Sequence, residues 1–313
     1  MHTIVVTAQS FSRHETLCTE LEALALEHEF RVIHASFDSL CHDDQVRILK
    51  PAKVWVVGKE PVTQALIDQL PELAMVCKYG VGKDNVDEGA LATRRVTLGW
   101  KGGVNADSVA EFSIGLMISL LHRVAYTSSL MRRGVWQKRG GVDLRGRMVG
   151  VVGAGAVGSR VLKLAAALGC RVCFTDILAK KDLCAELSCQ QIGLKQLLKE
   201  SDVVSIHVPL TAETRGMIGS SELELIGPES FLINTARGEV AETDAVVKAC
   251  RDGIIAGAAM DVYSKEPFLD GGRIDHPNVL ATPHIAGNSA EAVLNMGRAA
   301  LSSLKEYLSG HSP

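Results

Sequence analysis

The chain has 313 residues, of which 47% are hydrophobic and 22% charged, the composition of an ordered globular protein. Its length exceeds one ordinary hydrophobic core and predicts two domains. The net charge of −3 gives no electrostatic basis for binding nucleic acid or an anionic membrane, and no apolar run is long enough to cross a bilayer.

The first half alternates apolar, β-branched runs with helical segments, beginning with a strand at residues 3–8. No secretory signal pattern precedes this strand and the cysteines form no disulfide framework, so we expect a cytoplasmic protein. Because the runs lack polar alternation, they predict parallel strands buried on both faces. The further strands expected in this half lie at residues 30–34, 54–57, 75–78 and 96–98, and the helices include residues 12–29 and 63–69.

A glycine-containing loop within the first half and a helical segment that joins the two halves are also informative. The loop at residues 79–87 follows a strand, and its closely spaced Gly80 and Gly82 can present backbone N–H groups to a carboxylate. The alternative is a turn that glycine merely permits. Residues 106–131 then predict one long helix. Apolar side chains nearly encircle it, so we expect it to pack between elements or subunits.

A glycine-rich turn opens the second half, between a strand at residues 148–152 and a helix at residues 157–167. The first glycine permits a tight turn, the second lets the backbone approach a pyrophosphate, and the third lets the helix pack on the strand. The next strand ends in a carboxylate that can accept hydrogen bonds from both ribose hydroxyls. The pattern predicts a dinucleotide site, against the alternative of an ordinary strand–helix turn. The residues assigned to it are Gly153, Gly155, Ala156, Val157, Gly158 and Asp176.

Polar residues follow later strands, at the edge where open α/β sheets place their sites. Arg237 offers two parallel donors to an anionic substrate, or else forms a surface salt bridge. His284 can exchange a proton near neutral pH, or else is structural. A carboxylate at Glu266 would pair with this imidazole and raise its pKa. After a dinucleotide fingerprint, these three residues predict hydride transfer coupled to proton transfer.

The ordered set of motifs resembles the D-isomer-specific 2-hydroxyacid dehydrogenases, most closely the 3-phosphoglycerate dehydrogenase branch without its C-terminal regulatory domains. The matching segments span nearly the whole chain: residues 79–87, 105, 108–111, 153–158, 208–214, 235–238, 261–267 and 283–285. The resemblance implies two doubly wound α/β domains. A Rossmann NAD-binding domain, residues 100–285, would be inserted into a flavodoxin-like substrate domain of residues 1–99 and 286–313. It also implies an active-site cleft between the domains and a homodimer built through the nucleotide domains.

The resemblance further implies residue roles. Arg237 would bind the substrate carboxylate and keto oxygen, and Glu266 would orient and charge His284. His284 would be the acid in reduction and the base in oxidation. Besides the glycine turn and Asp176, the implied NAD contacts are Val109, Val208, Pro209, Thr214, Thr235, Ala236 and Asp261. The implied substrate contacts, besides Arg237, are Val81, Gly82 and Asn105, and no metal is expected.

The sequence also gives expectations for the cofactor and the substrate. The charge of Asp176 should repel a 2′-phosphate, so NAD is expected over NADP. The expected substrate is a small D-2-hydroxy acid or its 2-keto partner, with 3-phosphoglycerate as one candidate. The alternatives are a glyoxylate or hydroxypyruvate reductase, or a NAD-sensing corepressor-like protein without turnover. In one departure from the family pattern, Trp100-Lys101-Gly102-Gly103 stands where relatives often carry a Pro-Gly turn.

Overall fold

The computed structural model describes residues 1–38 and 40–310, and the chain divides into two compact units. The first unit consists of Met1–Asn105 with Asn288–Pro313, and the inserted unit is Ala106–Gly287. The boundaries therefore fall later than the predicted 99/100 and 285/286. Residues 100–105 stay with the first unit, where the Trp100 indole N–H donates to the Val81 carbonyl at 2.9 Å. At the return, the backbone N–H of Ala286 donates to Asp261 of the inserted unit at 2.8 Å. The last three residues of the predicted substrate domain lie outside the described residues.

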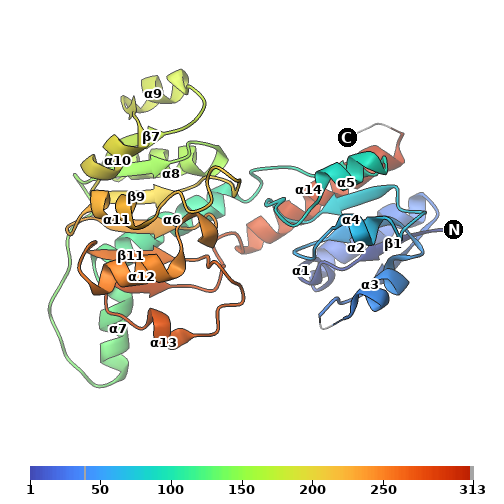
Figure 1. Cartoon of the computed structure of the whole chain (residues 1–313). Helices are drawn as coiled ribbons and strands as arrows, with labels where there is room; N and C mark the ends of the chain where they lie inside the picture. The colour runs from blue at the N-terminus through green and yellow to red at the C-terminus, as the bar shows by residue number, and fades with distance from the viewer. Residues whose placement is uncertain (39, 311–313) are drawn as a thin grey trace. The chain divides into compact units, whose positions relative to one another are not determined.

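The first unit is built on a parallel sheet with the strand order β2-β1-β3-β4-β5 (Figure 1). This is the flavodoxin-like order of a doubly wound fold. Its strands are β1 (His2–Val6), β2 (Phe30–His34), β3 (Ala52–Val57), β4 (Met75–Lys78) and β5 (Thr97–Gly99). Its helices are α1 (Gln9–Ser12), α2 (Glu15–Glu27), α3 (His42–Leu49), α4 (Gln64–Ile67), α5 (Glu88–Thr93) and α14 (Ala290–Leu308).

The two faces of this sheet carry separate apolar clusters, as buried parallel strands require. Ile4 of β1 packs with α2 and α14 on one face, whereas Val5 packs with α4 and α5 on the other. The helix predicted at residues 12–29 is found as α2, and it begins later than predicted because the backbone of His14 is extended. The final helix, α14, begins with a capped turn in which the Ser289 side chain accepts the Ala292 N–H.

The inserted unit contains a second parallel sheet, in the order β12-β11-β10-β9-β6-β7-β8. The order reverses between β6 and β9, which is the switch point where doubly wound sheets bind nucleotides. Its strands are β6 (Met148–Val152), β7 (Arg171–Thr175), β8 (Gln190–Gln191), β9 (Val203–Ile206), β10 (Phe231–Asn234), β11 (Gly257–Met260) and β12 (Val279–Ala281). Its helices are α6 (Ala106–Leu121), α7 (Val124–Arg132), α8 (Ala156–Ala167), α9 (Lys181–Leu187), α10 (Leu194–Glu200), α11 (Ser220–Ile226), α12 (Thr243–Arg251) and α13 (Gly271–Ile274).

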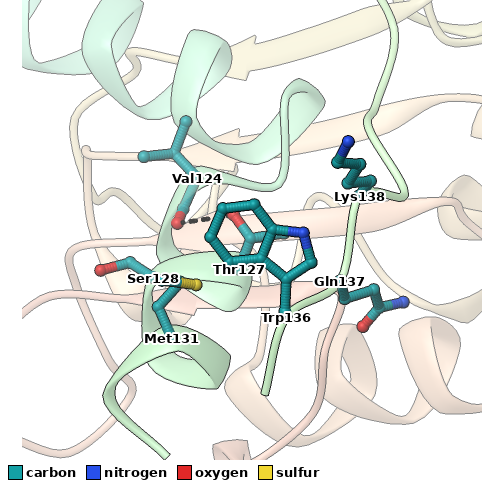
Figure 2. Close-up of a pocket in the computed structure, with 7 residues that line it drawn as sticks. All are labelled: Val124, Thr127, Ser128, Met131, Trp136, Gln137 and Lys138. Atoms are coloured by element: carbon teal, nitrogen blue, oxygen red, sulfur yellow. Dashed lines mark hydrogen bonds between the residues drawn. The ribbon is translucent and has the colours of Figure 1, made fainter. Parts of the chain in front are cut away.

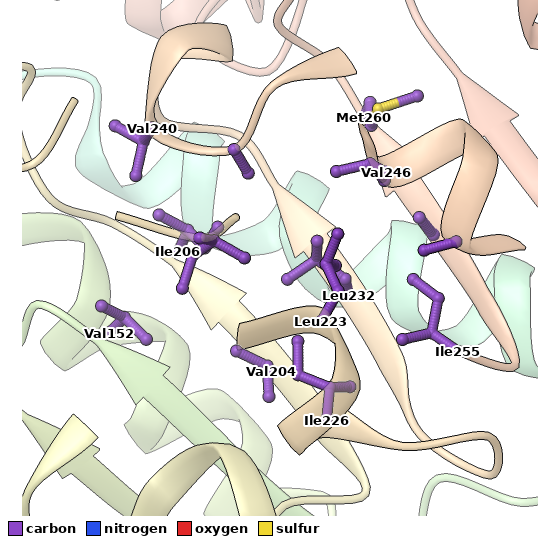
Figure 3. Close-up of a cluster of buried hydrophobic side chains, with 14 of the residues drawn as sticks. Val152, Val204, Ile206, Leu223, Ile226, Leu232, Val240, Val246, Ile255 and Met260 are labelled. Atoms are coloured by element: carbon purple, nitrogen blue, oxygen red, sulfur yellow. The ribbon is translucent and has the colours of Figure 1, made fainter. Parts of the chain in front are cut away.

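Successive residues of the central strands face opposite sides of this sheet. Leu232 of β10 joins the cluster formed with α10, α11 and α12 (Figure 3), and Ile233 joins the one formed with α6 and α8. The prediction of two parallel-sheet α/β domains is therefore confirmed. Because helices cover both faces of the sheet, polar side chains gather at the carboxyl ends of its strands.

The long helix predicted at residues 106–131 is in fact two helices, α6 and α7, which meet at a bend of 63°. Arg123 has a φ of 59°, and this left-handed conformation cannot continue an α-helix. Helix α6 packs its apolar side chains into the core of its own unit, which explains why they nearly encircle it. Within the described residues, no single helix has the length and apolar composition needed to cross a membrane.

Candidate active site

The glycine turn between β6 and α8 has the geometry of a phosphate-binding turn. Gly153 has a φ of 91°, and a side chain on Gly158 would overlap the Gly153 carbonyl oxygen. At Gly155, by contrast, no described atom lies within 4 Å of where a Cβ would stand. The backbone is therefore open at this point to a close ligand, and the N–H groups at the start of α8, at Ala156 and Val157, favour a negative charge.

Asp176 stands at the end of β7 beside this turn. One of its carboxylate oxygens accepts the Ala154 N–H and the other accepts the Leu178 N–H, both at 2.8 Å. The carboxylate thus fixes the turn and keeps lone pairs for the hydroxyls of a ribose. The open cradle at Gly155 and this placed carboxylate fit a bound dinucleotide.

The other predicted cofactor residues surround the same strand ends. A Cβ on Gly153 would lie 2.7 Å from Val208, so the turn packs directly on the segment after β9. The Thr214 hydroxyl donates to the Pro209 carbonyl at 2.6 Å and closes that segment. On the other side, Ser113 of α6 joins the Val109 carbonyl to the Thr235 hydroxyl, at 2.7 and 2.9 Å, and Ala236 is buried next to them in sequence.

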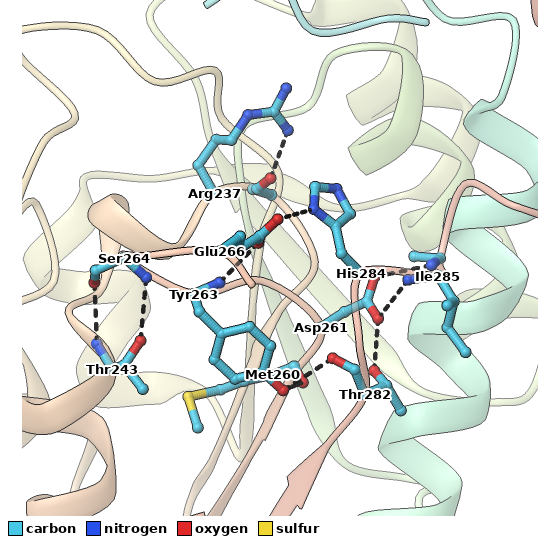
Figure 4. Close-up of polar contacts among 12 residues, drawn as sticks. Arg237, Thr243, Met260, Asp261, Tyr263, Ser264, Glu266, Thr282, His284 and Ile285 are labelled. Carbon is cyan, nitrogen blue, oxygen red and sulfur yellow. Dashed lines mark hydrogen bonds and ion pairs between the residues drawn. The ribbon is translucent and has the colours of Figure 1, made fainter. Parts of the chain in front are cut away.

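His284 and Glu266 form a hydrogen-bonded pair, with Nδ1 and Oε2 2.7 Å apart (Figure 4). The hydrogen bond to Glu266 raises the pKa of His284, against the opposing effect of burial. Burial acts to raise the pKa of Glu266, but the hydrogen bond and charge of His284 outweigh it, and the net shift is downward. An ionised Glu266 requires a proton on Nδ1, so Nε2 is the nitrogen whose protonation changes.

Arg237 lies beside this pair, on the turn after β10. Its guanidinium donates to the Ala236 carbonyl at 2.7 Å, and its charge acts on both Glu266 and His284. A side chain on Gly238 would overlap the backbone of Tyr263, so this turn lies directly against the segment that carries Glu266. Figure 4 shows Arg237, Glu266 and His284 gathered at these neighbouring loops. The group joins an anion-binding cation to a proton donor.

Asp261 is fully buried below the pair, and its carboxylate holds the segment that carries His284. It accepts the Thr282 hydroxyl at 2.6 Å, the Ile285 N–H at 2.9 Å and the Ala286 N–H at 2.8 Å. His284 itself has a φ of 56°, a left-handed conformation that is uncommon outside glycine. The sequence did not indicate this scaffolding role. A contact between Asp261 and the nicotinamide carboxamide stays a prediction.

Comparison with known families decides the class. Residues 114–286 match the family described as "D-isomer specific 2-hydroxyacid dehydrogenase, NAD binding domain". The chain belongs to this family. It is accordingly a NAD-dependent dehydrogenase of D-2-hydroxy acids, and the inserted unit contains its NAD-binding domain.

Among the relatives of this dehydrogenase is a glyoxylate reductase of Thermococcus litoralis, 33% identical over 81% of this chain and 80% of that protein. A glycerate dehydrogenase of Methylorubrum extorquens is 30% identical over 96% of both chains. Among solved structures, the NADPH-dependent glyoxylate/hydroxypyruvate reductase of Sinorhizobium meliloti is 26% identical, with a TM-score of 0.83 over 98% of this chain and 94% of that one. These names support the predicted alternative, glyoxylate or hydroxypyruvate reduction, better than 3-phosphoglycerate.

Apart from Arg237, the predicted substrate residues of the dehydrogenase lie in the first unit, far in sequence from the His284 group. Among the described residues, no acceptor is found for the backbone N–H groups of Gly80, Val81 and Gly82. The Asn105 side chain is half-buried, and no hydrogen bond of it is found within the described part of the chain. These N–H groups of the 79–87 loop are therefore open to an acceptor, and their contact with an anion stays a prediction.

His207 after β9 and the cysteines Cys170 and Cys173 near β7 contact residues outside the Arg237, Glu266 and His284 group. His207 donates to or accepts from Ser205 at 2.8 Å, and burial lowers its pKa to about 3, so it stays uncharged. Cys170 and Cys173 are both free thiols that contact different partners, Leu144 and Ser201. The described residues contain no cluster of three or more His, Cys, Asp or Glu side chains placed to hold a metal.

Proposed function

We propose that this dehydrogenase reduces a short 2-keto acid without a phosphate group, glyoxylate or hydroxypyruvate, to the 2-hydroxy acid. The observation that carries the proposal is the 2.7 Å pair of His284 and Glu266 beside Arg237, on the strand ends that also carry the glycine turn. A cation and a proton donor are what a keto acid needs at its carboxylate and its keto oxygen. The names of the relatives favour these two substrates.

The cofactor and the three side chains have separate roles in the proposed reaction. When bound, NADH supplies the hydride that reduces the keto carbon. The Arg237 guanidinium binds the substrate carboxylate through parallel N–H donors and polarises the keto oxygen. His284 gives its Nε2 proton to that oxygen, while ionised Glu266 holds Nδ1 and stabilises the imidazolium. In the oxidative direction the same nitrogen removes the hydroxyl proton.

The first unit contributes substrate contacts in this proposal. The backbone N–H groups of Val81 and Gly82 would bind the carboxylate end of the substrate, together with the Asn105 amide. Support comes from the missing acceptors for the loop N–H groups within the described residues. Such preorganised donors bind an anion without reorganisation when the substrate arrives.

The test is the rate of NADH oxidation with glyoxylate, hydroxypyruvate and phosphohydroxypyruvate, followed by absorbance. The His284→Ala variant should lose roughly 10²–10⁴ in turnover while still binding NADH, because a general acid is missing. The half-exposed His122 serves as the control, since His122→Ala removes an imidazole that lies 3.8 Å from the Asp143 carboxylate, outside the His284 group. Unchanged turnover in His284→Ala would overturn the assignment. Tight NADH binding without turnover of any keto acid would instead support the sensor alternative.

We also propose a preference for NAD over NADP, because Asp176 places a negative charge beside the glycine turn. The similar reductase of Sinorhizobium meliloti is NADPH-dependent, so the cofactor preference of this chain needs its own test. The measurement is kcat/KM for NADH and NADPH with the same keto acid. Comparable values would contradict the role given to Asp176.

A homodimer through the inserted unit is proposed on the basis of an exposed apolar patch. The patch surrounds a pocket between α7 and residues 136–138 (Figure 2), where Met131 and Trp136 are 53% and 74% exposed. Large exposed apolar side chains gathered in one place are typical of interaction surfaces. Sedimentation of the wild type and of a Met131→Ser, Trp136→Ser variant tests this. A monomeric wild type at micromolar concentration would contradict the proposal.

A further inference from the structure

Trp100 packs against the 79–87 loop of its own unit. The indole N–H donates to the Val81 carbonyl at 2.9 Å, and the Lys83 ammonium lies 4.5 Å from the centroid of the ring. Lys83 is held in turn by Glu88, at 2.9 Å. The indole therefore contacts the loop through one hydrogen bond and one cation–π contact, and 36% of the residue remains exposed.

The residues after Trp100 are suited to this packing. A Cβ on Gly102 would lie 2.9 Å from the indole ring, closer than side chains tolerate. Glycine at this position therefore lets the ring fold back over its own chain. The Trp100-Lys101-Gly102-Gly103 segment thus packs as a unit with the 79–87 loop. This segment is the one that departs from the usual family pattern.

The hydrogen bond to Val81 fixes the direction of a neighbouring donor. In a trans peptide the C=O of one residue and the N–H of the next point to opposite sides. With the Val81 carbonyl held by Trp100, the Gly82 N–H must point away from the indole. Two residues earlier, the Tyr79 carbonyl is held likewise by the buried Lys78 ammonium at 3.3 Å, which sets the direction of the Gly80 N–H.

We propose that Trp100 is a positioning residue for substrate binding, because it aims the Gly82 N–H at the carboxylate of the keto acid. The inference rests on the proposed role of this loop in binding that carboxylate. Trp100 would then affect substrate affinity through its contact with the loop, without touching the reacting atoms. Loss of Trp100 should therefore weaken keto-acid binding while leaving the chemical step and NADH binding unchanged.

The experiment uses Trp100→Phe, which keeps an aromatic face for Lys83 but removes the N–H donor. The KM for glyoxylate should rise about threefold to tenfold, the effect of one lost hydrogen bond, with kcat and the KM for NADH within about twofold of the wild type. Gly102→Ala, which displaces the ring, should reproduce the rise with Trp100 still present. Tyr307→Phe is the control, since it also removes a polar atom from an aromatic side chain of the first unit.

Calorimetric titration of the NADH-loaded enzyme with oxalate reads the carboxylate site without turnover. The dissociation constant for oxalate should rise by the same factor as the KM in Trp100→Phe. An unchanged KM and unchanged oxalate affinity in an active variant would overturn the positioning role. An equal loss in kcat and in NADH affinity would also overturn it, by showing a general structural defect. Failure of the wild type to turn over any keto acid would count against the proposed function, and oxalate binding would then decide the role of Trp100 separately.

Discussion

Replacing Glu266 with glutamine tests how the site sets the proton affinity of His284. The amide oxygen of Glu266→Gln can still accept from Nδ1, so the change removes the charge and keeps this contact, while the amide NH2 group replaces the oxygen that accepts the Tyr263 N–H at 3.1 Å. In the wild type, the hydrogen bond to Glu266 raises the pKa of His284. Reduction needs the imidazolium, so it should persist up to this raised pKa and fall as the pH climbs through it. In Glu266→Gln the alkaline limb of reduction should move to lower pH, and so should the acid limb of oxidation.

The size of the effect follows from the contact. A hydrogen bond to a charged group contributes about 1.5–3 kcal/mol, and one between neutral groups about 0.5–1.5 kcal/mol. The two side chains are 47% and 36% exposed, so water screens the charge and the low end of the difference applies. A loss of about 1 kcal/mol from the imidazolium form corresponds to roughly fivefold slower reduction on the alkaline side, with little change at acid pH.

The assay is kcat/KM against pH in both directions, because that ratio reports the groups of the free enzyme. Glu224→Gln, an exposed glutamate on α11, controls for the change of net charge. An alkaline limb that stays in place in Glu266→Gln, or moves to higher pH, would refute the reasoning. So would an equal shift in the control.

Two further outcomes follow from buried contacts. Asp261→Asn cannot accept three hydrogen bonds from residues 282–286 as the carboxylate does, so a buried donor loses its partner at a cost of about 1–3 kcal/mol. Both the melting temperature and kcat should fall; a variant with unaltered kcat would contradict the scaffolding role. Gly158→Ala should weaken NADH binding at least about tenfold in a fluorescence titration, because the new Cβ overlaps the Gly153 carbonyl oxygen. Gly115→Ala, where the described atoms leave open space in α6, should bind NADH normally, and equal losses in both variants would point to a nonspecific effect.

The fold could be predicted largely because its signals are local. Runs of β-branched residues gave the sheet strands, and the glycine turn gave its nucleotide-binding end. The two-residue strand β8, Gln190–Gln191, has no apolar run to reveal it and was not predicted. The break at Arg123 was missed for a similar reason, since a left-handed residue within an apolar stretch leaves no mark on the hydrophobic period.

The site shows where such reasoning stops. Residue type and strand-end position pointed to Arg237, Glu266 and His284. In the structure, the side chains of Glu266 and His284 form a hydrogen bond of 2.7 Å. For Asp261, only the family resemblance implied a role, a contact with the cofactor; the structure adds that its buried carboxylate accepts three donors from the His284 segment. The sequence shows an aspartate next to a site, but it does not show whether the carboxylate contacts a ligand or holds a loop in place. Only the positions of its donors distinguish the two, and here they show that a buried carboxylate holds the residues on both sides of the left-handed His284.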